Sequence, residues 1–273
     1  MKNQNSLGKQ KLNDAGRLFV LLPIFDEANT IGNLISRVHF ELPNCRIIAV
    51  NDGSRDKSLE VLESTLCADD ILCSYKINMN VGTVFSEGIN VFLTHGKVGD
   101  ILVIMESDDT SEVKSIPMLV DAMHKQQTDV VIASRNIGQG GYRNFPLKRR
   151  ILSYGANRLM RMRFPICEVR DYTIFFRVYS YQLLNNVAQL YGRHGMIRSK
   201  GFAANAELLV KIGLAGGKVS EIPYLYDYGK KKGPSKIRIF STLIEYLLMW
   251  KELVRISKIL IDKESTEDKI DIR

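Results

Sequence analysis

Short apolar runs alternate with amphipathic stretches through the first half of the chain. The runs predict buried strands at 18–22, 46–50, 71–77, 101–105 and 130–133. Between them, apolar residues recur with a helical period at 31–38, 59–62 and 116–123, and a helix is also expected to end near 94. This alternation at short spacing predicts an α/β fold with a mostly parallel central sheet flanked by helices.

The pattern changes after position 135. We predict a basic amphipathic helix at 145–164, a strand at 170–177, a helix at 202–214 and a strand at 219–226. Positions 236–260 predict a long amphipathic C-terminal helix whose apolar stripe has basic flanks. Three partners fit that stripe: the protein core, a second copy in a homo-oligomer, and a membrane surface.

Three carboxylates follow directly on the apolar run 101–105, namely Glu106, Asp108 and Asp109. Ligands bind at the carboxyl ends of strands in open α/β sheets, and closely spaced carboxylates need a cation nearby. Mg²⁺ or Mn²⁺ shared with a substrate diphosphate meets that need. A solvated acidic turn before the next helix, with Thr110 or Ser111 as its N-cap, explains the same residues without a metal.

Other chemical groups follow neighbouring predicted strands. Pro23, Phe25 and Glu27 come after the first strand, Asp52 after the second, and Arg135 after the strand at 130–133. Carboxyl ends of parallel strands meet at one edge of a sheet, so we expect these side chains to lie together. A nucleotide bound there would have an aromatic wall and carboxylates for the N–H groups of its base.

The net charge of +8 is concentrated in two basic clusters. One is Arg143–Arg163, which contains no acid, and the other is Lys230–Lys232 with Lys236 and Arg238. Such clusters favour phosphate groups, or they form solvated helix faces. We expect no nucleic-acid partner, because the clusters lack interleaved aromatic residues and a known reader motif. A dinucleotide oxidoreductase is disfavoured because no Gly-x-Gly-x-x-Gly follows the first strand.

The cysteines and the chain start bear on location. Cys45, Cys67, Cys73 and Cys167 lack metal-ligand spacing, which predicts free thiols in a reducing compartment, and the four histidines are isolated in sequence. The start lacks the apolar core of a signal peptide, and no apolar run reaches membrane-spanning length. We therefore expect a cytoplasmic protein, either free or resting peripherally on the cytoplasmic face of a membrane.

A series of motifs resembles the family 2 glycosyltransferases of the GT-A fold. The motifs are Pro23–Glu27, Asn51–Ser54, Gly82–Phe85, Met105–Asp108, Val131–Arg135 and Arg170–Arg177. Within that family the chain is most similar to the dolichyl- or polyprenyl-phosphate hexosyltransferase branch. The resemblance implies a GT-A catalytic domain over 17–228, a basic loop and amphipathic helix over 229–261, and polar tails at 1–16 and 262–273.

The resemblance also implies a donor site. The residues holding the nucleoside would be Pro23, Phe25, Glu27, Val50 and Asp52. Glu106 and Asp108 stand where the family has its Asp-x-Asp metal motif. The remaining members of this site would be Ser107 as a substrate contact and Thr110 or Asp109 as a further ligand for Mg²⁺ or Mn²⁺.

Basic residues would complete the site that the resemblance implies. Arg135 would face the donor diphosphate or the acceptor phosphate, and Arg149 and Ser153 would contact the acceptor phosphate. The late element Gly233–Lys236 is similar to a loop that closes over the diphosphate, and its contributions would be Lys231, Ser235 and Lys236. Two residues depart from the family pattern, since Asn51 and Glu106 each replace an aspartate.

The implied reaction is an inverting transfer of a hexose from a GDP- or UDP-linked sugar to a polyprenyl or dolichyl phosphate. Such an acceptor arrives ionised and needs no general base. A saccharide hydroxyl, as in cell-wall polysaccharide synthesis, would need Asp171 or Asp109 to take its proton. Asp171 can instead form a salt bridge to Arg170 or Arg177. The departures at Asn51 and Glu106 also leave a nucleotide-sugar-binding protein without turnover as an alternative.

Overall fold

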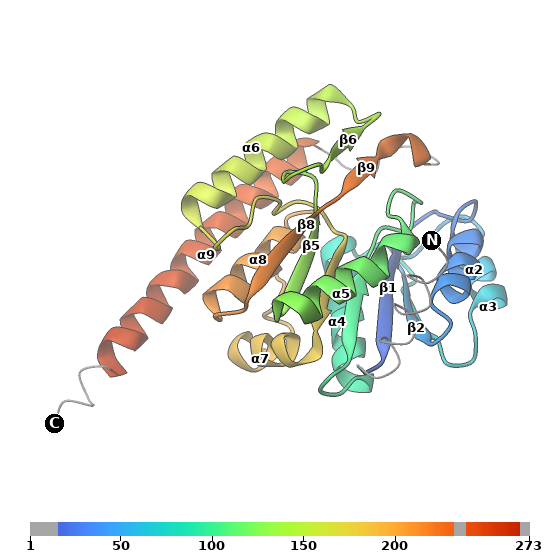
Figure 1. The fold of residues 1–273 in the computed structure, drawn as a ribbon, viewed down its shortest axis with the longest axis horizontal. Helices are drawn as coiled ribbons and strands as arrows, with labels where there is room; N and C mark the ends of the chain where they lie inside the picture. Colours follow the sequence, from blue (N-terminus) through green and yellow to red (C-terminus); the bar gives the residue numbers. More distant parts are fainter. Residues whose placement is uncertain (1–15, 232–238, 268–273) are drawn as a thin grey trace.

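The computed structural model describes residues 16–231 and 239–267 of the 273-residue chain. Within these residues, a seven-stranded sheet has the order β3-β2-β1-β4-β7-β5-β8 (Figure 1). Its strands are β1 (Leu18–Ile24), β2 (Cys45–Asn51), β3 (Ile71–Ser74), β4 (Ile101–Ile104), β5 (Val130–Ser134), β7 (Arg177–Ser180) and β8 (Val219–Pro223). Only β7 runs antiparallel to its neighbours among these strands, so the predicted mostly parallel sheet is confirmed.

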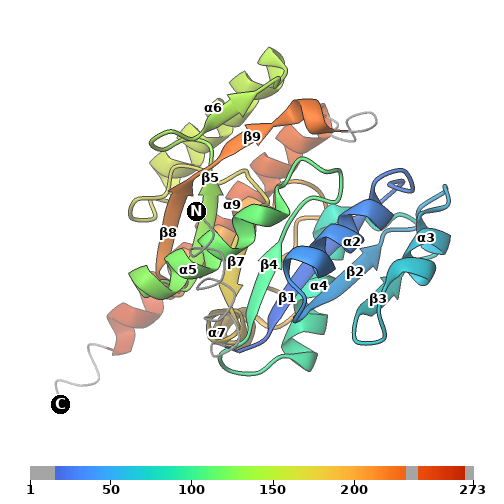
Figure 2. The ribbon, with the colours of Figure 1, turned by 45° about the vertical axis from the view of Figure 1, so that its right-hand side comes forward.

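Helices cover both faces of this sheet (Figures 1 and 2). The helices on one face are α2 (Ile31–Glu41), α3 (Ser58–Thr65) and α5 (Ile116–Gln126), the last preceded by the 3₁₀ turn η1 (Val113–Ser115). Those on the other face are α4 (Val81–His95), α7 (Tyr181–Tyr191) and α8 (Ala204–Leu214). The central strands β1 and β4 are apolar along their whole length because both of their faces are buried.

Close packing of α4 on β1 depends on one glycine. A Cβ atom at Gly88 would lie 2.2 Å from the Leu21 side chain, so a larger residue there would push the helix off the sheet. Leu21 itself is fully buried. The α4 helix is thereby held beside the strand whose carboxyl end supplies Pro23.

A smaller layer projects from the end of the main sheet. It consists of β6 (Gly141–Arg143) paired in parallel with β9 (Leu225–Asp227), the 3₁₀ turn η2 (Tyr228–Lys230), and the helices α6 (Leu147–Arg163) and α9 (Ile239–Glu267). The two helices lie side by side (Figure 1), and the ring centroids of Phe164 and Trp250 are 6.4 Å apart at their contact. No helix in the described part of the chain is long and apolar enough to span a membrane.

Three of the predicted elements differ most from the structure, and α7 and β6 were not predicted. Residues 170–176 form a loop, because the Asp171 carboxylate accepts hydrogen bonds from the following backbone amides of Thr173 and Ile174. The predicted strand 219–226 is divided at Tyr224, whose N–H donates to the main sheet while its carbonyl accepts from the β6 strand. The last helix continues to Glu267, since its polar end is rich in good helix formers.

Candidate active site

A cavity of about 1030 Å³ lies at the carboxyl ends of β1, β2 and β4, below α6 and α9. Most of the residues predicted to bind substrate line it: Pro23, Phe25, Glu27, Asp52, Glu106, Ser107, Asp108, Arg135, Arg149, Ser153 and Lys231. The part under the two helices is largely apolar and includes Ile151, Leu152, Leu159, Phe175, Phe202 and Leu243. The cavity therefore joins a polar end at the strand termini to an apolar end between two helices, and its size suits a drug-sized or larger ligand.

The first two strands end in carboxylates at the polar end. Glu27 and Asp52 are both largely buried, and Asp52 accepts a hydrogen bond from the Met79 amide at 2.6 Å. Burial raises the pKa of Asp52. Val50 was predicted to hold the nucleoside, but its side chain is fully buried in β2 and does not line the cavity. Val50 lies within β2, where neighbouring elements bury both faces of the sheet, whereas Asp52 follows the last residue of the strand.

Asn51, one of the two departures from the family pattern, has a local role. Its amide nitrogen donates to Ser74 Oγ at 2.9 Å, and its oxygen accepts from the Ser54 amide at 3.2 Å. The side chain ties β2 to β3 and to the turn that follows β2, and it is not among the residues that line the cavity. Its replacement of an aspartate therefore alters this turn rather than the cavity wall.

Glu106 and Asp108 present their carboxylates at the end of β4. Glu106 accepts a hydrogen bond from the Ser111 hydroxyl, and Asp108 forms an ion pair with Lys231. Burial, followed by repulsion from Asp108, raises the pKa of Glu106. The Ser107 hydroxyl between them donates to the Pro23 carbonyl at 2.5 Å, which links the ends of β4 and β1.

These two carboxylates fit a hard divalent cation. Both offer oxygen atoms, which Mg²⁺ and Mn²⁺ prefer, and they line the same cavity. A cation beside Glu106 would offset its burial and the repulsion from Asp108, which are the two causes of its raised pKa. In the structure the ammonium group of Lys231 supplies a positive charge at Asp108.

The other two predicted ligands, Thr110 and Asp109, are not among the residues that line the cavity. The Thr110 hydroxyl donates to Asp108 Oδ1 at 2.5 Å and accepts from the Tyr226 hydroxyl at 3.1 Å, and Thr110 does not line the cavity. We assign Thr110 to positioning Asp108 instead of binding metal directly. Asp109 forms an ion pair with Arg37 and is also absent from the cavity wall. Its φ of 71° is in the left-handed region of the backbone.

Arg135 is held at the cavity by Asp171. Its Nε and Nη2 atoms donate to the two carboxylate oxygens at 2.8 and 2.7 Å, and Nη2 also reaches Thr173 Oγ1 at 2.7 Å. Asp171 has no exposed surface and does not line the cavity, so the structure does not support its predicted role as a general base. The alternative partners Arg170 and Arg177 are also wrong, because the ion pair is made with Arg135.

Arg149 and Ser153 lie on the face of α6 that turns toward the cavity. The Arg149 guanidinium lies 5.3 Å from the ring centroid of Phe145 and 5.1 Å from that of Tyr228, which limits its freedom through cation–π contacts. Ser153 Oγ is 3.0 Å from Thr173 Oγ1, which also binds Arg135. Ser153 is thus linked to Arg135 through Thr173, whereas Arg149 contacts two aromatic rings.

Several cavity residues were not predicted from the sequence, and two predicted residues lie beyond the described part of the chain. Glu245 of α9 lines the cavity, and burial raises its pKa. Its isolated acidic position within the apolar stripe of α9 was the available signal. Ser235 and Lys236, predicted to close over the diphosphate, lie outside the residues that the structure describes.

Comparison with known proteins identifies the family. The model of "Glycosyl transferase family 2" matches residues 19–188, which include every strand-end carboxylate of the cavity. The chain belongs to glycosyl transferase family 2. This family 2 glycosyltransferase is also similar to proteins of several organisms. It is 26% identical to a dolichol-phosphate mannosyltransferase of Pyrococcus furiosus, with 85% of this chain and 62% of that protein covered.

A second relative and a solved structure agree with this assignment. The chain is 25% identical to the polyprenol monophosphomannose synthase of Mycolicibacterium smegmatis, with 81% of each protein covered. Its fold matches glucosyl-3-phosphoglycerate synthase from Mycobacterium tuberculosis with a TM-score of 0.60 at 16% identity, covering 90% of this chain and 80% of the other. The protein is therefore an enzyme of the glycosyltransferase class with the GT-A fold, as the sequence motifs predicted.

Proposed function

We propose that this enzyme transfers a hexose, with inversion, from a nucleotide-diphosphate sugar to a polyprenyl or dolichyl phosphate. The observation that carries the proposal is the continuity of the cavity, from the carboxylates at the strand ends to the apolar region between α6 and α9. The names of the relatives favour a lipid-phosphate acceptor. The matched solved structure contains Mn²⁺ and uridine diphosphate, which favours a nucleotide-linked donor.

The polar end would bind the donor. Glu27 and Asp52 accept N–H groups of the base, and the ring of Phe25 packs beside it. Glu106 and Asp108 would hold Mg²⁺ or Mn²⁺, which when bound neutralises charge on the leaving diphosphate. Lys231 already lies at Asp108, so its ammonium group is close enough to contact the same phosphates.

The acceptor end favours an ionised nucleophile. Arg149 would orient the acceptor phosphate, and the apolar side chains of α6 and α9 would surround the first isoprene units. A saccharide hydroxyl would need a base, but neither predicted base, Asp171 or Asp109, lines the cavity. A phosphate acceptor needs none, because it is already charged.

A thermal-shift series with GDP- and UDP-sugars and Mn²⁺ tests the donor assignment. A ligand at about 100 times its Kd should add about 2.7 kcal/mol to the free energy of unfolding, and one nucleotide series should therefore raise the melting temperature clearly more than the other. Transfer of a labelled sugar to a short-chain polyprenyl phosphate then tests the reaction. Donor binding without any transfer or donor hydrolysis would favour a binding protein that lacks turnover.

Arg149→Ala tests the acceptor assignment. Loss of a charge-assisted contact worth about 1.5–3 kcal/mol should raise the KM for polyprenyl phosphate by roughly 10- to 100-fold. The Kd of the donor, measured calorimetrically, should stay within about twofold of the wild-type value, because the proposal assigns Arg149 to the acceptor phosphate and not to the donor. Lys148→Ala is the matched control, since Lys148 is the preceding exposed cation and does not line the cavity. Equal loss of donor and acceptor binding would contradict the assignment.

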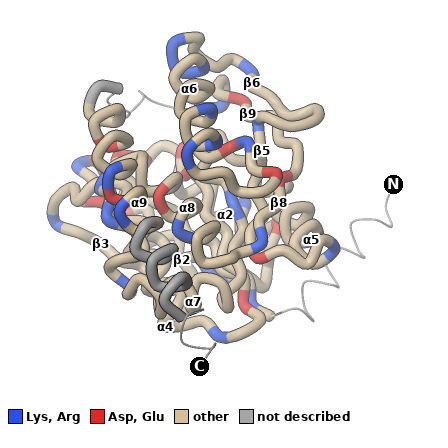
Figure 3. Tube along the Cα trace, turned by 90° about the vertical axis from the view of Figure 1, so that its left-hand side faces the viewer, with Lys and Arg blue, Asp and Glu red and all other residues tan. Residues whose placement is uncertain are grey.

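The helices α6 and α9 also present a surface that suits a membrane. Their exposed apolar residues include Leu147, Ile151, Tyr154, Met162, Leu243, Ile244, Leu247 and Leu248. Lys and Arg recur along α6 beside them (Figure 3). The opposite side of α9 packs on the protein through the buried Met249 and Leu253, so only part of its apolar stripe is taken up by the core.

Leu247→Asp combined with Leu248→Asp should weaken binding to anionic liposomes by at least about tenfold in a flotation assay, because two apolar side chains of about 1.5 kcal/mol each no longer enter the interface. Met118→Asp, on the distant α5, is the control and should float like wild type. Wild-type protein that does not float, together with a dimer that the double variant disrupts, would instead assign this surface to a homo-oligomer.

A further inference from the structure

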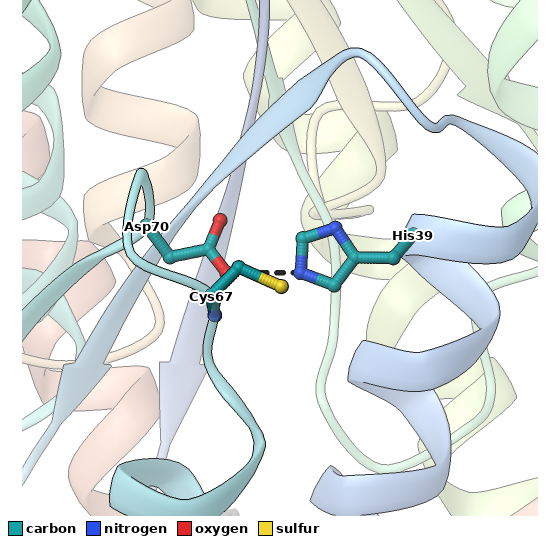
Figure 4. Close-up of side chains that lie close together, drawn as sticks. All are labelled: His39, Cys67 and Asp70. Carbon is teal, nitrogen blue, oxygen red and sulfur yellow. Dashed lines mark hydrogen bonds and ion pairs between the residues drawn. The ribbon is translucent and has the colours of Figure 1, made fainter.

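A cluster of three metal-binding residue types lies away from the cavity. The ligand atoms of His39, Cys67 and Asp70 are all within 4.8 Å of one another (Figure 4). His39 is in the last turn of α2, and the other two belong to the loop between α3 and β3. Asp70 immediately precedes β3, so the cluster is at the amino end of that strand, whereas the cavity is at the carboxyl ends of the strands.

Backbone hydrogen bonds hold the Asp70 carboxylate in place. Oδ1 accepts from the Ile47 amide at 2.8 Å, and Oδ2 accepts from the Cys67 amide at 2.8 Å. The Asp70 amide donates back to the Cys67 carbonyl at 3.0 Å, which closes a turn and places both side chains on the same side of the loop. The Asp70 side chain is 1% exposed and the His39 side chain 22%. The cluster is thus built on a fixed carboxylate and remains open at its outer side, where Cys67 is exposed.

The orientation of the three groups is that of ligands around one point. His39 Nε2 is 2.9 Å from Asp70 Oδ2, and in Figure 4 the Cys67 sulfur lies toward the same edge of the imidazole ring. A nucleophilic Cys–His–Asp relay would use the two ring nitrogens for different partners. Here the thiol and the carboxylate approach one nitrogen, which disfavours that kind of catalysis.

The ligand set selects a zinc-class ion. Zinc binds imidazole nitrogen and carboxylate oxygen at about 2.0–2.2 Å, so a tetrahedral site separates those two atoms by about 3.3 Å. The observed distance from His39 Nε2 to Asp70 Oδ2 is 2.9 Å, so these two atoms would have to move apart by only a few tenths of an ångström. A thiolate and an imidazole disfavour Mg²⁺ and Mn²⁺, which prefer oxygen ligands. This site would therefore differ in metal preference from Glu106 and Asp108.

We propose that His39, Cys67 and Asp70 bind one zinc-class divalent ion, with the fourth coordination position open to water. The bound ion would join the end of α2 to the α3–β3 loop and so brace that edge of the domain. It would have no part in sugar transfer, since the cluster is outside the cavity. The proposal does not depend on the identity of the donor or of the acceptor.

Cobalt titration of the reduced full-length protein tests this site. A thiolate–Co²⁺ charge-transfer band should appear at one equivalent and disappear when Zn²⁺ is added. The band should persist in Asp108→Asn, because a carboxylate site gives no thiolate band, and in Cys167→Ser, whose thiol is exposed elsewhere. Cys67→Ser should abolish it. Zn²⁺ should raise the melting temperature of wild type and of Cys167→Ser, but not that of Cys67→Ser.

Calorimetry gives a second measure. His39→Gln should weaken Zn²⁺ binding by at least about 100-fold, since loss of a direct ligand costs no less than loss of an outer-shell partner. Cys67 is exposed, so its serine variant should keep the wild-type circular dichroism spectrum and remain informative even if His39→Gln does not fold. No band in wild type with excess Co²⁺, or an equal band in Cys67→Ser, would overturn the proposal.

Discussion

Asp108→Asn is expected to reduce sugar transfer by at least about 100-fold while the circular dichroism spectrum stays close to that of wild type. The variant keeps the shape of the side chain but removes the charge that would face a cation and the donor diphosphate. Loss of one group that stabilises developing charge typically costs about 10²- to 10³-fold in kcat. Transfer of a labelled hexose at saturating donor and Mn²⁺ measures the effect.

Asp109→Asn is the matched control for this experiment. It removes a neighbouring carboxylate that pairs with Arg37 outside the cavity, and asparagine tolerates the positive φ at this position. We expect its kcat to remain within about threefold of wild type, because the lost carboxylate is outside the cavity. The fold should also be retained, because an exposed ion pair contributes at most about 1 kcal/mol to stability. Full activity of Asp108→Asn, or an equal loss in both variants, would remove Asp108 from the proposed metal site.

Asp171→Asn is expected to lower the free energy of unfolding at pH 7 by about 3–5 kcal/mol, measured by urea denaturation. The substitution leaves the Arg135 guanidinium buried without its negatively charged partner, and breaking a buried pair from one side costs about that much. Activity should fall as well, because Arg135 would lose the carboxylate that orients it at the cavity. Asp121→Asn is the control. It breaks the exposed pair with Lys125 and should cost about 0.5 kcal/mol or less.

The stability that Asp171→Asn removes should depend on pH in a known direction. Burial by itself would raise the pKa of Asp171, but the charge of Arg135 and its hydrogen bonds outweigh burial and lower that pKa. A carboxyl whose pKa is lower in the folded state contributes stability above its unfolded pKa of about 3.9, and the contribution is lost as pH falls through the folded pKa. The difference in free energy of unfolding between wild type and Asp171→Asn should therefore become smaller below about pH 4. A constant gap across that range would contradict the ion-pair assignment.

Much of the fold and part of the site followed from local patterns. The apolar runs predicted the strands β1, β2, β4 and β5, because buried parallel strands are apolar throughout. Since parallel strands end at one edge, the same patterns also predicted that Glu27, Asp52 and Asp108 would meet, and all three line one cavity. Their roles in binding remain predictions.

Other contacts join residues that no sequence spacing relates. Nothing local to Asp171 indicates Arg135 as its partner, because the pair forms only when the loop 170–176 folds against the end of β5. The histidines and cysteines likewise look isolated along the chain, yet the return of β3 beside β2 brings Cys67 and Asp70 to His39.

The amino-acid sequence by itself determined the layered α/β architecture, the edge of the sheet where chemistry gathers and the glycosyltransferase family. These depend on periodicity and on short motifs, which are local properties of the chain. Only the tertiary structure decided that Asp109 and Asp171 pair with arginines and do not line the cavity, that Val50 belongs to the core, and that Glu245 enters the cavity. Those outcomes depend on which side chains reach one another after folding, because ion pairing and burial act through space.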